Sequence, residues 1–467
     1  MVIGSKIKGF HIRILLQIAA HLDSPAPSVA KFAHEPSTNL TCSEKTPLKN
    51  LSCVSWRWRK IVLPILFRYS RIPLDPNPQW VPIDARIIDN MQGQLTKLSN
   101  HELQVYQHMR SKFKSSGSSA YEESFDDLLI NLCRIDDGDN FLKSVPHILW
   151  FPHLPRTGFT QFSRFVQQYT LKHHIKNVVV YADRNYELRH VSTADAHLAK
   201  VVQEIWTQIF ELLEPTRIVV AAPPSTLAGL LDAQMLSADT WAFDMKMHYV
   251  EFAQQEQSLQ KIQHTGPKCR PWNAALVHRR PWNHLAYNEG SSISAYSTYE
   301  YHLKQSPRML YLILLRLAKE ASDCCNIRSF SFTGVFPFHT NTTVVIRALQ
   351  KIRTLRQVTF QLAPGPENDL LNAPKRMGRA QPSDLWLEWN GCYKIMTGFL
   401  GAYEFADGAR FVSKDCSVEA VKQDVGEYME LLQKKGLGWT ADGEGVWVRD
   451  CSRDREVPST AVPPPDL

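Results

Sequence analysis

The stretch from Leu48 to Ile72 reads LKNLSCVSWRWRKIVLPILFRYSRI. Its apolar residues recur three and four positions apart, which predicts an amphipathic helix. Pro64 is expected to end or kink that helix, because proline lacks the amide donor and its ring clashes with the preceding turn. A second, shorter apolar stripe lies upstream, at Ile14, Leu15, Ile18 and Leu22. The N-terminal region is therefore predicted to consist of short amphipathic helices.

These two stripes carry a family resemblance. The core Val-Ser-x-x-Trp-Arg at 54–59 and the following Pro-x-Leu-Phe-Arg at 64–68 resemble the F-box of fungal F-box proteins. That family usually opens its first helix with Leu-Pro, whereas residues 9–16 contain no proline, and the Pro/Ser-rich loop at 23–47 is longer than usual. Helices this short cannot bury their own apolar faces, which is why such a module docks onto a partner.

The resemblance implies a defined partner, the Skp adaptor of a cullin-type ubiquitin ligase. The residues implied to bind the Skp adaptor are Leu15, Ile18, Leu22, Leu48, Leu51, Val54, Trp58, Leu66 and Phe67. From residue 12 to about 450 the chain also resembles a family of large fungal F-box proteins. The segments that carry this wider resemblance are 221–228, 241–249, 288–301 and 384–389. The wider resemblance implies no known substrate.

Beyond about residue 171 the pattern changes to alternating strands and helices. Continuous apolar strands are predicted at 177–181, 217–222, 328–333 and 356–362. Such strands, alternating with helical stretches, indicate a parallel sheet covered by helices. Residues 348–362 have the character of a leucine-rich repeat, but the predicted strands are unevenly spaced, whereas such repeats run at about 20–29 residues. The predicted fold is thus a helical F-box followed by an α/β domain with irregular, leucine-rich-repeat-like strand–helix alternation.

The same patterns divide the chain into four parts. We expect an F-box over 1–75 and a helical connecting region over 76–170. An α/β domain with leucine-rich-repeat-like character is expected over 171–450, where it would bind the target. The tail at 451–467, which contains several prolines, is predicted to be disordered.

Composition narrows the class of protein. The chain has 467 residues, 44% hydrophobic and 21% charged, which is usual for globular proteins. Its net charge of +7 includes no dense block of Lys or Arg, so nucleic-acid binding is not indicated. No apolar run has the length needed to span a membrane. Nine scattered cysteines without a Cys-x-x-Cys pair predict reduced thiols in a cytoplasmic or nuclear protein.

An enzymatic α/β domain is the alternative to a target-binding one. The turn at 223–226 follows a predicted strand and carries two hydroxyls, and ligands bind at such ends of open α/β sheets. The turn lacks the glycines of a nucleotide-binding loop, and the chain has no hydrolase or metalloprotease motif. A capped strand-to-helix turn is the favoured interpretation. No catalytic residue, cofactor or metal site is predicted.

A polar-aromatic segment is the candidate for binding a target protein. The sequence Arg-Pro-Trp-Asn occurs at 270–273 and again at 280–283, and several tyrosines follow. Arg, Trp and Tyr are enriched in binding hot spots. The candidate target-binding residues are Arg280, Trp282, Tyr287, Tyr296 and Tyr299. An equally weighted alternative is a long loop held to the core by its aromatic side chains.

The sequence thus predicts a non-catalytic adaptor of a Skp–cullin–F-box ubiquitin ligase, in which one end binds the Skp adaptor and the other a protein target. The alternative is a small-molecule-binding or hydrolytic α/β domain with the N-terminal helices as packing elements. Its ligand would lie between the 223–226 turn and the 282–301 segment. A third hypothesis is a scaffold that binds the Skp adaptor without promoting ubiquitination.

Overall fold

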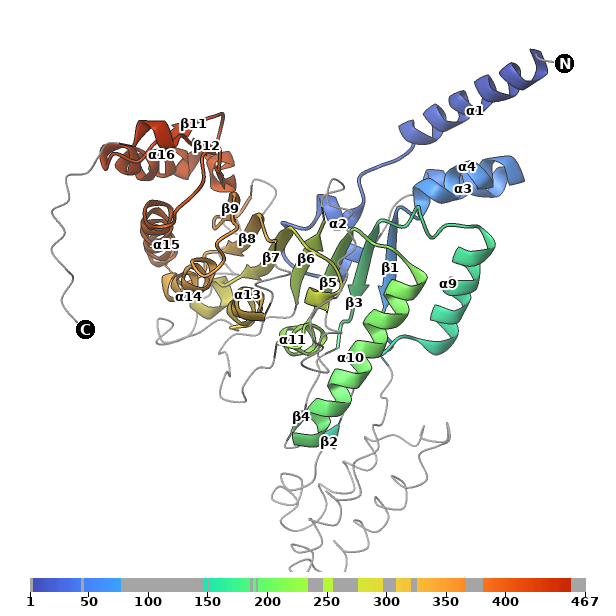
Figure 1. The fold of residues 1–467 in the computed structure, drawn as a ribbon, viewed down its shortest axis with the longest axis horizontal. Coiled ribbons are helices and arrows are strands. Elements are labelled where there is room, and N and C mark those ends of the chain that lie inside the picture. The colour runs from blue at the N-terminus through green and yellow to red at the C-terminus, as the bar shows by residue number, and fades with distance from the viewer. Residues whose placement is uncertain are drawn as a thin grey trace, which may run out of the picture.

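The computed structural model describes residues 3–42, 46–76, 147–148, 152–184, 188–189, 192–233, 247–254, 276–296, 308–320, 326–365 and 381–454. Over these ranges the chain is a mixed α/β protein built on a ten-stranded, mostly parallel sheet (Figure 1). The strands of that sheet are β1 (Tyr69–Pro73), β3 (Asn177–Tyr181), β5 (Arg217–Ala222), β6 (His248–Ala253), β7 (His284–Ser291), β8 (Ser329–Val335), β9 (Gln357–Gln361), β10 (Arg410–Ser413), β11 (Trp439–Ala441) and β12 (Val446–Arg449). A separate two-stranded sheet pairs β2 (His147–Ile148) with β4 (Leu188–Arg189).

The strands follow one another across the sheet almost in chain order, β1-β3-β5-β6-β7-β8-β9-β10-β12-β11. Strands β1, β3 and β5 pair in parallel, and so do β7, β8, β9 and β10. Strand β6 lies antiparallel between these two groups, and β12 and β11 close the sheet as antiparallel strands. Because each crossover steps in the same direction, right-handed connections place the crossover helices on one face. This strand order differs from that of a doubly wound sheet, in which the order reverses.

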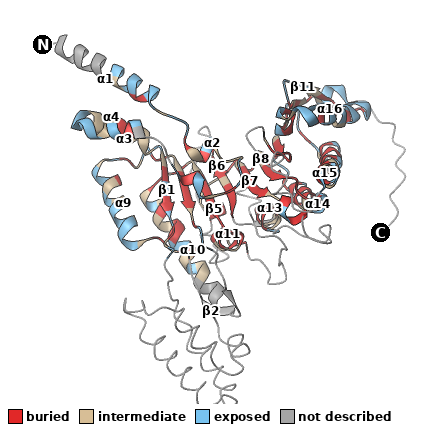
Figure 2. Ribbon diagram, turned by 180° about the vertical axis from the view of Figure 1, so that it is seen from behind, coloured by how far each residue is buried: buried red, intermediate tan, exposed pale blue. Residues whose placement is uncertain are grey.

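The helices lie mainly along one face of the sheet. They are α1 (Ile3–His21), α2 (Pro27–Ala30), α3 (Thr46–Val54), α4 (Trp56–Leu66), α9 (Arg156–Gln168), α10 (Ser192–Leu212), α11 (Pro224–Leu230), α12 (Ile293–Tyr296), α13 (Met309–Glu320), α14 (His339–Leu349), α15 (Pro382–Ala402) and α16 (Glu419–Lys434). Short 3-10 turns are η1 (Thr38–Thr41), η3 (Leu276–His278), η7 (Lys414–Ser417) and η8 (Cys451–Arg453). Side chains alternate along each strand, so Val178, Val220 and Phe330 join the large core under the helices. Figure 2 shows these central strands as almost entirely buried.

The opposite face, here called the open face, is covered at β3, β5 and β6 by residues 26–42 rather than by long helices. This strap contains α2 and η1 and connects α1 to α3. Leu40 and Phe32 pack on the apolar side chains that point to this face, among them Val179, Val219 and Tyr249. Residues 26–42 of the Pro/Ser-rich loop predicted between the two N-terminal stripes are therefore an ordered part of the sheet's cover.

The N-terminal helices differ from the prediction at one point. The break falls at Ser55, between α3 and α4, rather than at Pro64. Ser55 is extended, at φ −158° and ψ 162°, and its hydroxyl accepts a hydrogen bond from the Trp58 amide at 3.3 Å. A serine N-cap starts a new helix in this way. Pro64 sits inside α4, where the chain continues to Leu66.

Several predicted boundaries also change. Strand β1 lies within the predicted F-box part yet pairs with β3, so residues 1–75 are not separate from the sheet. The predicted 76–170 region contains α9, but 77–146 lies outside the described residues. Contrary to the predicted disordered tail, 451–453 forms η8, and Asp454 pairs with Arg449 at 2.5 Å. The tail beyond 454 lies outside the described residues.

Candidate functional site

The three N-terminal helices α1, α3 and α4 share a small apolar cluster. Ala19 of α1, Leu48 of α3 and Val62 of α4 form its buried centre. The partly buried side chains packed on this centre are Leu51, Trp58, Ile65 and Leu66. Ala19 is the only described α1 side chain that is fully buried, so α1 is attached to its neighbours near its C-terminal end.

Most large apolar side chains described in α1, which lie from residue 12 onward, are exposed. Within the described part of the chain, the exposed ones at this end are Ile12, Ile14, Leu16, Ile18, Leu22, Val54 and Trp56. Val54, at the end of α3, is 68% exposed, and Trp56, which begins α4, is 58% exposed. Figures 1 and 2 show α1 projecting from the body beside α3 and α4. Concentrated exposed apolar area of this kind marks an interaction surface more often than a solvated one.

The structure separates the nine residues predicted to bind the Skp adaptor. Ile18, Leu22 and Val54 are exposed and accessible to a partner. Leu48, Leu51, Trp58 and Leu66 instead build the small cluster shared by the helices, and Leu15 is half-buried. Phe67 stacks on α9, with ring centroids 5.2 Å from Phe165 and 6.5 Å from Phe162. The predicted set omits four exposed apolar residues, Ile12, Ile14, Leu16 and Trp56. A helical repeat does not show which side of a helix neighbouring elements cover.

The strap is attached to the open face by hydrogen bonds from four strands. From β1, Arg71 donates to the Thr41 carbonyl at 2.6 Å, and from β5 Arg217 donates to the Ser28 carbonyl at 2.8 Å. On β6 the Tyr249 hydroxyl accepts from the Ser37 amide and donates to the Ser37 carbonyl, both at 2.5 Å. The Asn288 side-chain amide of β7 donates to the carbonyls of residues 32 and 34, at 2.6 and 2.8 Å.

Gly290 explains how the strap approaches β7 so closely. It has a φ of +78°, and a Cβ there would lie 2.9 Å from Pro36 Cδ and 3.0 Å from Glu35 Oε1. Glycine is therefore required both by the backbone conformation and by the space. The strap thereby fixes the chain that leads into α1 and α3 to the sheet.

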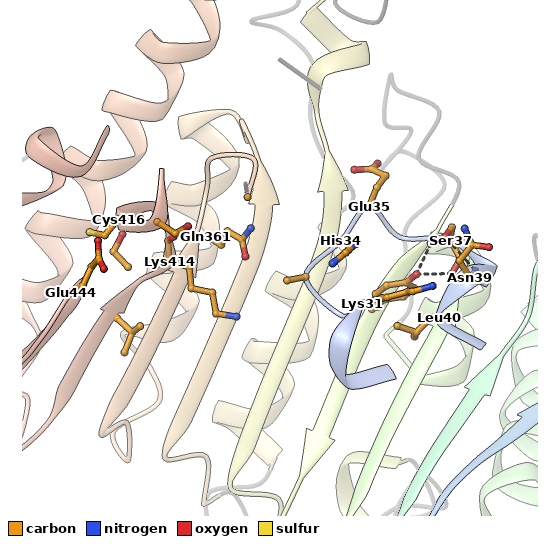
Figure 3. A pocket seen from close by; sticks show the side chains of 16 residues that line it. Lys31, His34, Glu35, Ser37, Asn39, Leu40, Gln361, Lys414, Cys416 and Glu444 are labelled. Atoms are coloured by element: carbon orange, nitrogen blue, oxygen red, sulfur yellow. Dashed lines mark hydrogen bonds between the residues drawn. The ribbon is translucent and has the colours of Figure 1, made fainter. Parts of the chain in front are cut away.

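A cavity of about 890 Å³ opens beside the strap on the open face (Figure 3). One wall is the strap, from Lys31 to Leu40, and the other is the end of β10 with η7. Its side-chain lining includes Lys31, His34, Glu35, Tyr249, Gln361, Val412, Lys414, Cys416 and Glu444. The volume is within the range of ligand-binding pockets, roughly 300–1,000 Å³. We take this strap-lined pocket as the candidate binding site of the sheet.

Asp415 fixes the wall formed by η7. Its carboxylate is fully buried and accepts four hydrogen bonds. Two come from the amides of Leu362 and Ala363, at 2.8 and 2.9 Å, immediately after β9. The other two come from Trp389 Nε1 at 3.1 Å and the Tyr393 hydroxyl at 2.7 Å, both on α15. Burial raises the pKa of Asp415, while these four bonds lower it.

The aromatic residues predicted to bind a target lie mostly in the core. Trp282, Tyr287 and Tyr296 are each at most 2% exposed. Their polar atoms bond inside the protein, to Leu276 O, His248 Nδ1 and Phe336 O respectively. Arg280 lies over the Phe210 ring at 5.7 Å. Tyr299 lies outside the described residues. Tyr287 lies on β7, Trp282 precedes that strand and Tyr296 lies on α12, and a partner cannot reach these three buried rings. The aromatic side chains are held to the core, as the alternative expects, but residues 284–291 form a strand rather than a loop.

The 223–226 turn is largely buried. Pro224 and Thr226 are buried, and the Thr226 hydroxyl donates to the Arg184 carbonyl at 2.6 Å. Helix α11 begins at Pro224, with Pro223 rather than Ser225 before its first residue. Among the residues with a described position, no group of three His, Cys, Asp or Glu side chains could hold a metal ion. None of the helices described is both long and apolar enough to cross a membrane.

Comparison with known proteins leaves the chain unassigned. No known family model matches it, and no curated protein or solved structure is significantly similar. The protein has two candidate binding surfaces, the exposed apolar end of the N-terminal helices and the strap-lined pocket.

Proposed function

We propose that the chain is a non-catalytic adaptor of a Skp–cullin–F-box ubiquitin ligase. Helices α1, α3 and α4 would act as the F-box and bind the Skp adaptor, while the sheet domain, with its leucine-rich-repeat-like alternation, would bind a protein target. The complex would operate in the cytoplasm or nucleus. Its contribution is proximity, because holding a target beside the ligase raises the effective concentration of the target's lysines.

One observation carries this proposal. The three N-terminal helices share a small core, and among the described side chains at this end of the protein seven large apolar ones are exposed. Burying one such side chain is worth about 1.5–3 kcal/mol, so a fraction of this surface could supply the affinity of a specific complex. The motif at 54–59, which resembles an F-box, lies in the same place, since Val54 and Trp56 are among the exposed residues.

The strap supports the proposal in a second way. An adaptor must hold its target in a defined position relative to the ligase. The hydrogen bonds of Arg71, Arg217, Tyr249 and Asn288 tie the strap to four strands, and the strap connects directly to α1 and α3. The proposed ligase-binding end and the proposed target-binding sheet are thus connected through the strap, whose residues 26–42 are bonded to the sheet.

The test is co-purification with the Skp adaptor after co-expression. Val54→Asp is the informative variant, because Val54 is 68% exposed and a charge there does not disturb the helical cluster. Burying an uncompensated carboxylate in an interface costs several kcal/mol, so we expect more than a hundredfold weaker binding. Leu51→Asp would be ambiguous, since Leu51 packs in the cluster itself.

Val29→Asp is the matched control. Val29 lies on the strap and is 50% exposed, away from the proposed interface. Retention of the Skp adaptor by wild type and Val29→Asp, with loss in Val54→Asp, would support the proposal. Equal retention by both variants would place any contact elsewhere. No retention by the folded wild type would remove the adaptor function.

A further inference from the structure

The strap-lined pocket contains two lysines whose ammonium groups have no partner among the described residues. Two lysines, Lys31 and Lys414, and two glutamates, Glu35 and Glu444, line it, so the formal charges cancel. Both glutamates have partners, however. Glu444 pairs with Lys422 at 2.7 Å, and Glu35 accepts a hydrogen bond from the Ser291 amide at 3.3 Å. For the side chains of Lys31 and Lys414, the described residues provide no hydrogen bond or ion pair.

Lys414 is the lysine on the η7 wall. It begins η7 and extends from that wall toward the strap, where His34 lies opposite (Figure 3). The residue is exposed, yet nearby protein lowers its pKa by desolvation, and Glu251 opposes this shift. Glu251 already pairs with Arg217 at 2.5 Å. The Lys414 ammonium group therefore lines the pocket without a counter-ion among the described residues.

A second donor faces the same space. Gln361, at the end of β9, lines the pocket and is only 8% exposed. Its side-chain amide makes no hydrogen bond to any residue whose position is described. The amide nitrogen and oxygen of Gln361 are not among the described polar atoms that are buried without a partner, so they are accessible to a ligand in the cavity. Lys414 and Gln361 both supply N–H donors, and the ligand chemistry that suits both is an anion.

We propose that the strap-lined pocket binds an acidic side chain of a polypeptide segment. Lys414 forms the ion pair, Gln361 donates a hydrogen bond, and Lys31 and His34 on the strap face the remaining part of the segment. This inference rests on the proposed function, because it identifies the class of target that the adaptor would recognise. The target of such an adaptor is a protein, so the acidic group that enters the pocket belongs to a polypeptide side chain.

The test uses peptide libraries in which only the central residue is fixed, as Glu, phosphoserine, Gln or Lys. The full-length wild type is immobilised, and the recovered amount of each library is measured. Charge-assisted hydrogen bonds are worth roughly 1.5–3 kcal/mol, so an acidic centre should be recovered about 10- to 100-fold better than Gln. Lys414→Met should remove the preference, and Lys414→Arg should keep it.

Lys434→Met is the matched control for loss of one lysine. Lys434 is 72% exposed on α16 and pairs only with Glu430, one turn away. It should select the same libraries as the wild type. Equal recovery of Glu, phosphoserine and Gln libraries by wild type would overturn the inference, and so would a preference that survives in Lys414→Met. A thermal stabilisation by inorganic phosphate that requires Lys414, with no peptide preference, would show a small-anion site and overturn the polypeptide assignment.

The two proposals can fail separately. Val54→Asp changes the N-terminal helices and should leave peptide preference unchanged, while Lys414→Met should leave binding of the Skp adaptor unchanged. Peptide preference without adaptor binding would remove the proposed function but keep the pocket. Adaptor binding without peptide preference would do the reverse.

Discussion

Replacing Tyr249 with phenylalanine tests whether the strap is attached as the structure indicates. The change removes one hydroxyl, which makes two hydrogen bonds of 2.5 Å with the Ser37 backbone. Burial raises the pKa of Tyr249, so the hydroxyl is protonated at neutral pH and able to donate. The ring itself stays, and with it the contact to Phe32 at 5.8 Å between centroids. The variant therefore isolates the hydrogen bonds from the packing.

The expected effect follows from those two bonds. A typical hydrogen bond contributes about 0.5–1.5 kcal/mol net, so the pair is worth about 2 kcal/mol. With 1.4 kcal/mol per factor of ten, the strap should open about 30-fold more often. Amide hydrogen exchange followed by mass spectrometry reads this directly, because the amides of Ala30 and Lys31 are bonded within the strap. Peptides from β8 and β9 should exchange at their wild-type rates.

Tyr181→Phe is the control for loss of a tyrosine hydroxyl on the same face. Tyr181 is half-buried in the same cluster, and its hydroxyl makes no hydrogen bond within the described residues. It should change strap exchange by less than about threefold, the scale of a few tenths of a kcal/mol. Equal acceleration in both variants would refute the reasoning, as would acceleration throughout the sheet in Tyr249→Phe, because the hydroxyl would then not act locally.

Two further predictions concern the core. Asp415→Asn leaves one acceptor oxygen for four buried donors. The free energy of unfolding, measured in urea, should therefore fall by about 3 kcal/mol. In the exposed control Asp442→Asn the free energy of unfolding should fall by less than about 1 kcal/mol. His248 is fully buried beside Tyr287, and burial lowers its pKa to about 3. In the unfolded chain His248 binds a proton below its ordinary pKa of 6.5, whereas in the folded protein it does so only near pH 3. The free energy of unfolding therefore falls as the pH drops from 6.5 toward 3, by up to about 5 kcal/mol. His248→Gln should flatten the pH dependence of unfolding across that window, and an unchanged slope would show that His248 is not the group responsible.

The sheet was predictable where apolar runs were continuous. Strands β3 and β5 match the predicted 177–181 and 217–222, because both faces of these strands are buried and the runs contain no polar interruption. Strand β7 was not predicted, because residues 284–291 lie in a polar-aromatic segment that was interpreted as a binding segment or, equally, as a loop held to the core. Its Asn288 side chain points to the open face and bonds the strap. The partner of Asn288 lies about 250 residues earlier in the chain, so no local pattern could show it.

The candidate site was less predictable for the same reason. Lys414 and Gln361 are separated from the strap by more than 300 residues, and neither belongs to a recognisable motif. The predicted hot-spot aromatics are of the right residue type for binding, yet Trp282 and Tyr287 serve the core. Composition identifies residues that can bind, whereas exposure depends on which elements cover them. The exposed face of α1 could be found only from the position of α3 and α4.

The strap gives the two proposed surfaces a common structural basis. Its N-terminal end follows α1, its C-terminal end leads to α3, and between them its residues form one wall of the pocket. A ligand bound to Lys31 or His34 therefore contacts the same segment that fixes the N-terminal helices to the sheet. Loosening the strap should therefore weaken both the attachment of the N-terminal helices to the sheet and the binding of a ligand in the pocket. If Tyr249→Phe frees the strap, peptide preference at the pocket should fall with it, because only one of the two walls remains in place. Unaltered preference in a variant with a freely exchanging strap would mean that the η7 wall alone, with Lys414 and Gln361, forms the anion site.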